Sequence, residues 1–437
     1  MHSTMKKLAM ALVAVMALGM AQDAPKPKVA KDQAEADLIN SLPKEPDAAK
    51  RLAILDKWKA GYPETAFADD RELAYMGTYD QLKRPKDAVA IAVQILSHNP
   101  DNFDALRTVL ADTAMINGGK PDESDLATEE KVANHFINDA DAVFAPKNKP
   151  AYMTDAQWTG AKDPMKAYSQ RTLGVIYMTR KDNVRAEAEL KKALDMSPTD
   201  SQVARWLADA ILAQQKDHPE KTKYALFYYA RAAAYDGAGS LPAQNRTQIQ
   251  GFLARAYKTY HGSDEGFNDL LAKAKTTADP GADFKLLSVT DLAEIDAKNA
   301  AEFAKSNPAM AMWQTIKTGL TGDNPDAFFE ASVKGAELPG GANGVQKFKG
   351  KIVSMTPANR PKEIVLAVEK PNVGDVTLKF EMPLPGKMEP GEEISFEGEA
   401  KAYTKDPYML TLETDKDKIE GWTGKNTVQK KAAPKKQ

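Results

Sequence analysis

Residues 167–200 read AYSQRTLGVIYMTRKDNVRAEAELKKALDMSPTD, and this stretch decides how most of the chain folds. Small and apolar residues recur in it every three or four positions, the spacing that gathers side chains on one face of an α-helix. The marked positions are Leu173, Gly174, Tyr177, Ala186, Leu190, Ala193 and Pro198. They predict two short amphipathic helices that cross closely at small residues and end at a proline. Such a pair cannot bury its apolar face alone, so we expect similar pairs to stack on it.

The spacing of these residues resembles the signature of the tetratricopeptide repeat (TPR) family, in which each repeat is a pair of antiparallel helices. The resemblance extends over residues 32–275, although the other repeats match the signature less well than 167–200 does. The repeats are 32–65, 69–102, 103–146, 167–200, 201–235 and 241–275. The third repeat carries an insertion at 118–130, which is either a lid or a passive loop, and residues 147–166 form a connector. The resemblance implies a TPR-like α-solenoid whose first helices line a concave groove that receives partner proteins.

The bulk composition is that of a globular protein without a strong charge preference. The chain has 437 residues, of which 43% are hydrophobic and 27% charged, and its formal net charge is −2. This charge is too small to indicate a nucleic-acid-binding or membrane-binding surface. The absence of cysteine excludes disulfides, thiolate nucleophiles and cysteine zinc sites.

The first residues have the pattern of a secretory signal peptide. Lys6 and Lys7 precede an apolar run from Leu8 to Met20, and small residues stand before a cleavage point after Ala21. We predict a signal peptide over 1–21 and a flexible Pro- and Lys-bearing linker over 22–31, and a periplasmic or secreted mature protein with no transmembrane segment.

Beyond the repeats the hydrophobic period changes from helical to alternating. Residues 276–340 keep a helical pattern without the repeat spacing and are expected to form a helical cap or bridge.

Five strands are predicted at 348–355, 363–368, 373–380, 394–402 and 408–412. Two glycine-bearing segments, FKGKIVS at 348–354 and PGEEISFEG at 390–398, make the region 344–424 resemble a small antiparallel β-barrel of the OB-fold kind. A sandwich or barrel of other topology is the alternative. Residues 425–437 are predicted to be a disordered Lys-rich tail. The predicted fold class is thus an α+β multidomain chain.

Three arginines recur at one position of the predicted first helices. Arg107, Arg171 and Arg205 each precede an inward apolar residue by two places, so stacked repeats would align their guanidinium groups along the groove. Arginine binds carboxylates well, and Tyr168 and Trp206 would add aromatic surface. We therefore predict that these five residues bind a partner peptide or helix, with an acidic one favoured. Ordinary salt bridges between neighbouring helices are the alternative role for the arginines.

Sequence motifs for catalysis are missing, so we expect no enzymatic activity, no metal site and no cofactor. The five histidines lack metal-ligand spacing, and the chain has no phosphate loop and no nucleophile elbow. The predicted function is that of an exported scaffold for protein–protein interaction, with no nucleic-acid partner. The alternative is a module of the β domain that binds cell-envelope glycan or another anion, for which Lys347, Lys349 and Lys351 alternate along the first predicted strand. Those lysines would otherwise protect a strand edge from aggregation.

Overall fold

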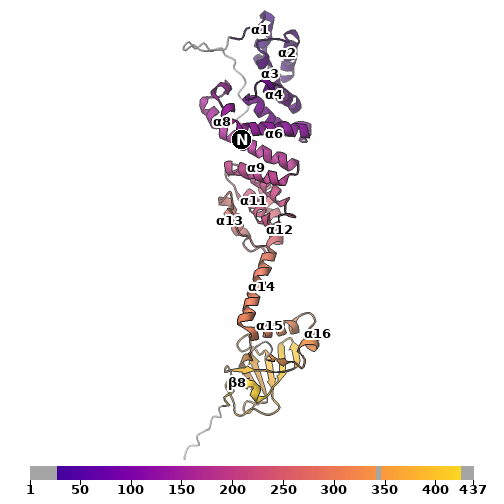
Figure 1. Cartoon of the computed structure of the whole chain (residues 1–437), viewed down its shortest axis with the longest axis vertical. Helices are drawn as coiled ribbons and strands as arrows, with labels where there is room; N and C mark the ends of the chain where they lie inside the picture. Colours follow the sequence, from indigo (N-terminus) through magenta and orange to yellow (C-terminus); the bar gives the residue numbers. More distant parts are fainter. Residues whose placement is uncertain (1–26, 341–345, 425–437) are drawn as a thin grey trace, which may run out of the picture. The chain divides into compact units, whose positions relative to one another are not determined.

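The computed structural model describes residues 27–340 and 346–424 (Figure 1). The predicted signal peptide over 1–21, the first half of the linker and the Lys-rich tail over 425–437 lie outside these ranges. The chain is an α+β protein, helical first and ending in a curled sheet, and it divides into two compact units at Val289 and Thr290. Among the described helices, none combines the length and the apolar character needed to cross a bilayer.

The first unit is built almost entirely from helices that follow one another with short connections. Several of them begin at an aspartate or asparagine whose side chain accepts backbone N–H groups, as Asn102, Asp182 and Asp200 do. The α-helices are α1 (Gln33–Ser41), α2 (Ala48–Gly61), α3 (Ala68–Gln81), α4 (Pro85–His98), α5 (Phe103–Asp112), α6 (Glu123–Asn138), α7 (Ala140–Val143), α8 (Asp155–Thr179), α9 (Asn183–Met196), α10 (Ser201–Leu212), α11 (Thr222–Ala234), α12 (Ala243–His261) and α13 (Phe267–Thr276). Short 3₁₀ turns are η1 (Leu42–Lys44), η2 (Thr113–Gly118), η3 (Pro146–Asn148) and η4 (Pro219–Lys221).

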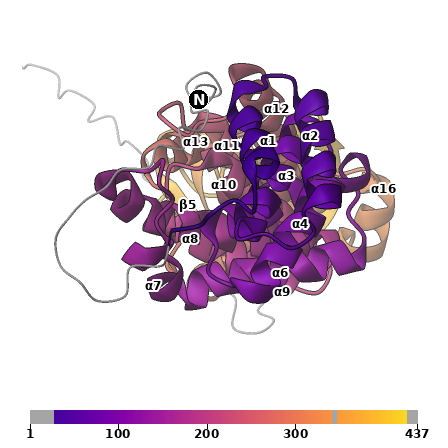
Figure 2. The same cartoon turned by 90° about the horizontal axis from the view of Figure 1, so that it is seen from above.

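Neighbouring helices pack on one another and share a continuous core. Contacts join α3 to α4, α4 to α5, α8 to α9, α9 to α10 and α10 to α11, and the helices α4, α6 and α9 lie toward one side of the view in Figure 2. Leu173, Ala186, Leu207 and Ala225 are all buried in the same hydrophobic cluster. A smaller cluster around Leu55, Trp58 and Tyr75 joins α2 and α3.

The close crossing of α8 and α9 depends on Gly174. A Cβ atom at this position would lie 2.5 Å from Cγ of Leu190, well inside van der Waals contact. The absence of a side chain therefore sets the distance between the two helices.

Two segments predicted as irregular are helical. Residues 155–166 of the predicted connector are the first part of α8, which continues through Pro164. The insertion at 118–130 is helical from Glu123 onward, because Asp122 and Asp125 form a capping box that begins α6. Trp158 anchors the early part of α8, where its ring packs against Phe103 and its Nε1 donates to the carbonyl oxygen of Phe144.

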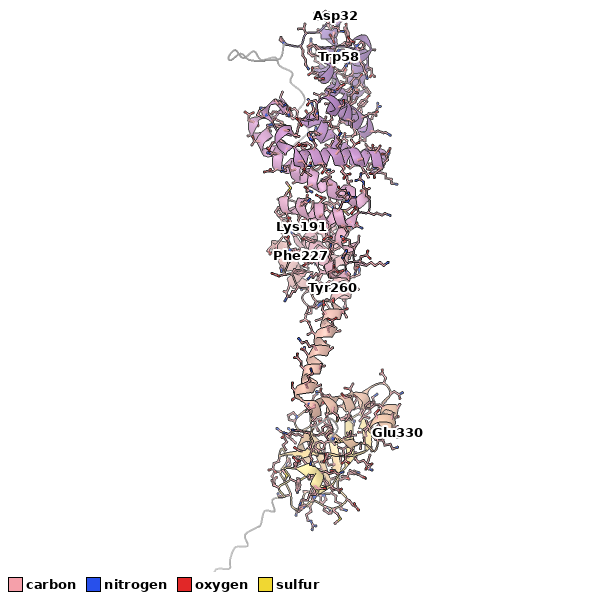
Figure 3. All side chains as sticks on the ribbon, in the orientation of Figure 1. Asp32, Trp58, Lys191, Phe227, Tyr260 and Glu330 are labelled. Carbon is pink, nitrogen blue, oxygen red and sulfur yellow. The ribbon has the colours of Figure 1, made fainter. Side chains whose placement is uncertain are left out.

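Residues 277–288, which follow α13, run back over the end of the first unit's core. Phe284 is buried against the ring of Phe227 at 5.3 Å between centroids. Asp279 forms an ion pair of 2.6 Å with Lys191, and the Tyr260 hydroxyl donates to the carbonyl oxygen of Leu286. Figure 3 labels Lys191, Phe227 and Tyr260, which mark the surface that this segment covers. The segment therefore closes the apolar end of the unit.

The second unit combines several helical segments with a mixed sheet. After α14 (Val289–Ser306), which has no buried residue, come α15 (Pro308–Thr321), α16 (Pro325–Phe328) and a π-helical turn η5 (Phe329–Val333). The strands are β1 (Glu337–Leu338), β2 (Phe348–Thr356), β3 (Glu363–Ala367), β4 (Val376–Lys379), β5 (Glu393–Phe396), β6 (Gly398–Lys405), β7 (Tyr408–Glu413) and β8 (Ile419–Glu420), with a 3₁₀ turn η7 (Lys416–Lys418) before the last. Their order in the sheet is β1-β6-β7-β4-β3-β2-β5-β8.

The sheet departs from the prediction in two respects. The pairing of β4 with β7 is parallel, so the sheet is not antiparallel throughout. The single strand predicted at 394–402 is two strands, β5 and β6, which pair with β2 and β7 respectively. Glycine at 398 permits this change of partner, since a Cβ there would lie 2.6 Å from the carbonyl oxygen of Glu413.

The core of the second unit includes the helix that precedes the sheet. Trp313 on α15 is fully buried, with its ring 5.3 Å from that of Phe348 and 6.4 Å from that of Phe396. Lys317, one turn further on, forms ion pairs with Glu369 and the buried Asp375. The helix α15 is therefore part of the same folded body as the strands.

Candidate functional site

The helices that carry the predicted binding residues are neighbours. The hydroxyl of Tyr168 on α8 donates to the carbonyl oxygen of Leu110 on α5, at 3.3 Å. On the other side, α8 contacts α10. The first helices of three successive predicted repeats thus lie in the order α5, α8, α10. We call the residues Arg107, Tyr168, Arg171, Arg205 and Trp206 on these helices the arginine strip.

Arg171 is at the centre of the strip and contacts both of its aromatic residues. Its guanidinium carbon lies 4.8 Å from the ring centroid of Tyr168 and 5.7 Å from that of Trp206, a cation–π arrangement on two sides. Both rings are partly buried against the core of the unit. The two rings that contact the guanidinium group are thus themselves held by packing.

The ion pair of Arg171 is long. Its Nη1 lies 3.5 Å from Oδ2 of Asp200, while the other oxygen of Asp200 accepts the backbone N–H groups of Gln202 and Val203 at the start of α10. A guanidinium group has five N–H donors, and this contact uses one of them. Donors therefore remain for a second carboxylate.

Arg107 and Arg205 also make long ion pairs, both within their own helices. Nη2 of Arg107 lies 4.0 Å from Oδ1 of Asp104, an oxygen that also accepts the hydroxyl of Tyr152. Nε of Arg205 lies 3.8 Å from Oδ2 of Asp209. Nearly half of each arginine side chain is exposed, 47% and 43% respectively.

The structure brings Tyr168, Arg171 and Trp206 into direct contact, and Arg205 is the chain neighbour of Trp206. Arg107 lies on α5 and forms no hydrogen bond, ion pair or cation–π contact with the other four among the described residues. The alternative role predicted for the arginines is a salt bridge between neighbouring helices. Among the three arginines, only Arg171 forms such a pair with the described residues, with Asp200.

Sequence reasoning missed the carboxylates of the strip. Asp104, Asp200 and Asp209 each lie beside one arginine, and Asp209 also accepts the hydroxyl of Tyr229. For Asp200 a signal was present, since an aspartate between Pro198 and the apolar residues of α10 is typical of a helix N-cap. No sequence pattern of this kind predicts the contacts that these residues make with neighbouring helices.

The alternative site on the β domain has a different setting from the one predicted. Lys347 forms ion pairs with Glu397 and Glu420. Lys349 and Lys351 are exposed on β2, but β2 pairs with β3 on one side and β5 on the other. These lysines therefore do not lie on a free strand edge.

Within residues 27–340 and 346–424, no three His, Asp or Glu side chains are arranged so that they could hold a metal ion. No family model matches the chain, and no match to a curated protein was found.

Proposed function

We propose that this protein is an exported TPR-type scaffold that binds an acidic peptide or helix of a partner protein along the arginine strip. The observation that carries the proposal is the contact of the Arg171 guanidinium group with the rings of both Tyr168 and Trp206, while its one ion pair among the described residues is long, at 3.5 Å. A guanidinium group fixed by aromatic rings, with most of its donors free, suits bidentate binding of a carboxylate. Export rests on the charge and apolar pattern of residues 1–21.

The repeat assignment is supported by local geometry that recurs between 69–102 and 167–200. In the same register, Tyr79, Lys83 and Pro100 correspond to Tyr177, Lys181 and Pro198. Both lysines have positive φ, 57° and 61°, in the turn between the two helices. In each turn the backbone N–H of the residue after the lysine donates to the tyrosine carbonyl oxygen at 2.9 Å, and an arginine lies over the tyrosine ring.

For the second unit we propose an OB-type barrel. An OB-fold is a five-stranded, partly open Greek-key barrel. Strands β2, β3, β4 and β7 supply four members, and β5 with β6, separated by Glu397 alone, supply the fifth. Since β5 pairs with β2 and β6 pairs with β7, this fifth arm links the two ends of the series.

The proposal predicts that reversing the charge of the strip abolishes partner binding. The double variant Arg171→Glu/Arg205→Glu places two carboxylates where an acidic segment would bind, so like charges would oppose it. The mature protein and the variant are used to capture proteins from envelope extract, and each captured protein is then identified and reduced to its binding peptide. Affinity of that peptide is measured by calorimetry, and we expect at least a roughly hundredfold loss.

A matched control changes the charge equally at another place. Lys216 and Arg255 are exposed residues outside the strip, so Lys216→Glu/Arg255→Glu should retain the partner peptide with little change. Equal binding by the strip variant and the control, or a binding peptide without acidic residues, would refute the assignment of the strip.

A further inference from the structure

A small hollow lies beside the turn between α3 and α4, and its lining includes none of the residues of the arginine strip. Its volume is about 210 Å³, and Asp80, Lys83, Pro85, Asp112 and Met115 line it. The turn forms because Lys83 takes a positive φ and Pro85 begins α4. Packing of α4 against α5 and η2 places Asp112 and Met115 opposite that turn.

Asp112 is the unusual member of this lining. It is only 5% exposed, yet its carboxylate has no hydrogen bond and no ion pair with the described residues. By contrast, the N-cap aspartates of the same unit accept backbone N–H groups. An ionised carboxylate with little access to water and no partner is unfavourable, so a cation that enters the hollow would gain a strong electrostatic contact.

The electrostatic surroundings of Asp112 are mixed. Burial, followed by the charge of Asp80, raises its pKa to about 6, while Arg107 and Lys83 act in the opposite direction. The carboxyl is therefore mostly ionised at neutral pH. Lys83 is exposed and forms no ion pair with Asp112 in the described structure.

We propose that this hollow binds the cationic end of a lysine or arginine side chain from a protein partner. Asp112 and Asp80 supply the negative charge, and Pro85 with the half-exposed Met115 supplies apolar surface for the aliphatic stem. The volume suits one side chain and falls below that of pockets for larger ligands. An inorganic cation is disfavoured because the described residues offer no group of three His, Asp or Glu ligands.

The proposal does not depend on the function of the arginine strip, and its test uses the full chain. Nα-acetyl-lysine amide is titrated into protein with ¹³C-labelled methionine methyl groups, and the methyl signal of Met115 reports on the hollow. The neutral probe, Nα,Nε-diacetyl-lysine amide, has the same stem without the charge. We expect a saturable shift of the Met115 signal with the charged probe, and a dissociation constant about tenfold higher in Asp112→Asn.

Each further arm distinguishes the proposal from an alternative. Equal shifts with the neutral probe, or unchanged binding in Asp112→Asn, would overturn it, and the signals of Met153 and Met388 in each variant verify that the fold is intact. If methylammonium chloride binds as tightly as the lysine probe, the aliphatic stem does not contribute to binding. If calcium or sodium chloride saturates the hollow, it is a site for inorganic cations. Either result refutes a site for a lysine or arginine side chain. Binding that weakens as the pH falls below about 6, where Asp112 becomes protonated, supports the proposal.

Discussion

The pKa values of two consecutive glutamates on α6 are shifted in opposite directions. Glu129 is buried on the face that also holds Leu126, Val132 and Ala133, and burial raises its pKa to about 8. Burial also acts to raise the pKa of Glu130, but hydrogen bonds from Arg180 and Tyr177 outweigh it and lower that pKa. Adjacent residues of the same type therefore have opposite linkages to pH.

The first prediction concerns the pH dependence of stability. The pKa of Glu129 in the folded state exceeds its usual value of 4.5, so the folded state binds more protons and loses stability as the pH rises from about 4.5 to about 8. We expect Glu129→Gln to remove this loss and raise the free energy of unfolding by up to ~4 kcal/mol above pH 8. Urea unfolding followed by circular dichroism between about pH 5 and pH 9 measures the effect.

Glu130→Gln is the matched control and should behave oppositely. The folded pKa of Glu130 is lowered, so its stabilisation is present above the unfolded pKa and disappears as the pH falls. We expect this variant to be destabilised at neutral pH. If both variants lose stability equally at high pH, burial is the wrong explanation for the raised pKa of Glu129.

At this scale the sequence predicted residue types better than contacts. The predicted core residues Leu173, Ala186 and Leu207 are buried, because helical periodicity alone places them on an inner face. The unpaired burial of Asp112 could not be predicted. It depends on packing that brings the turn at Lys83 close to α5, and the local spacing of residues does not predict such a contact between distant segments.

At the scale of the element, a helix crossing makes a second prediction. Gly174→Ala places a Cβ atom 2.5 Å from Cγ of Leu190, so α8 and α9 must separate. Overpacking of this kind costs about 1–3 kcal/mol, partly offset by the better helix propensity of alanine. We expect a lower melting temperature for the helical unit, measured by circular dichroism.

Gly77→Ala tests the opposite case in the corresponding helix of an earlier predicted repeat. A Cβ at Gly77 on α3 would meet nothing within 4 Å, so only helix propensity changes and stability should rise by about 0.5–1 kcal/mol. A melting temperature that rises in both variants would mean that the α8–α9 crossing tolerates a wider spacing.

Element boundaries were harder to predict than element types. Pro164 favours a break within 147–166, yet α8 extends through it, because Trp158 packs on Phe103 and Phe144 and holds the preceding turns in place. The stretch 394–402 alternates like one strand, but its two halves pair with different neighbours. Tertiary contacts determine both the continuation of α8 through Pro164 and the division of 394–402 into two strands. Such contacts are hard to predict from the local sequence.

At the scale of the whole molecule, the two units have separate hydrophobic cores. One core extends from α3 to Phe284, and the other includes Trp313, Phe348 and Phe396. A break in the sequence pattern near residue 340 predicts that the β domain begins at 344. However, Trp313, Ile316 and Leu320, which precede that break on α15, are buried with the strands. Helical periodicity reveals an apolar face on α15, but it does not reveal which partner covers that face.

The last prediction follows from the place of α15. A fragment of residues 307–424 keeps Trp313 against Phe348 and Phe396, and we expect it to unfold cooperatively with the stability of the second unit in the full chain. A fragment of residues 344–424 leaves that apolar surface exposed to water, and we expect weak, non-cooperative unfolding and binding of a hydrophobic dye. In the full chain, Trp313→Ala should lower the free energy of unfolding of the second unit by about 3–5 kcal/mol and leave the transition of the helical unit unchanged. Differential scanning calorimetry of the fragments and the variant separates the two transitions. Equal stability of the two fragments would show that α15 is an accessory to the sheet, because a core that needs Trp313 cannot form without it.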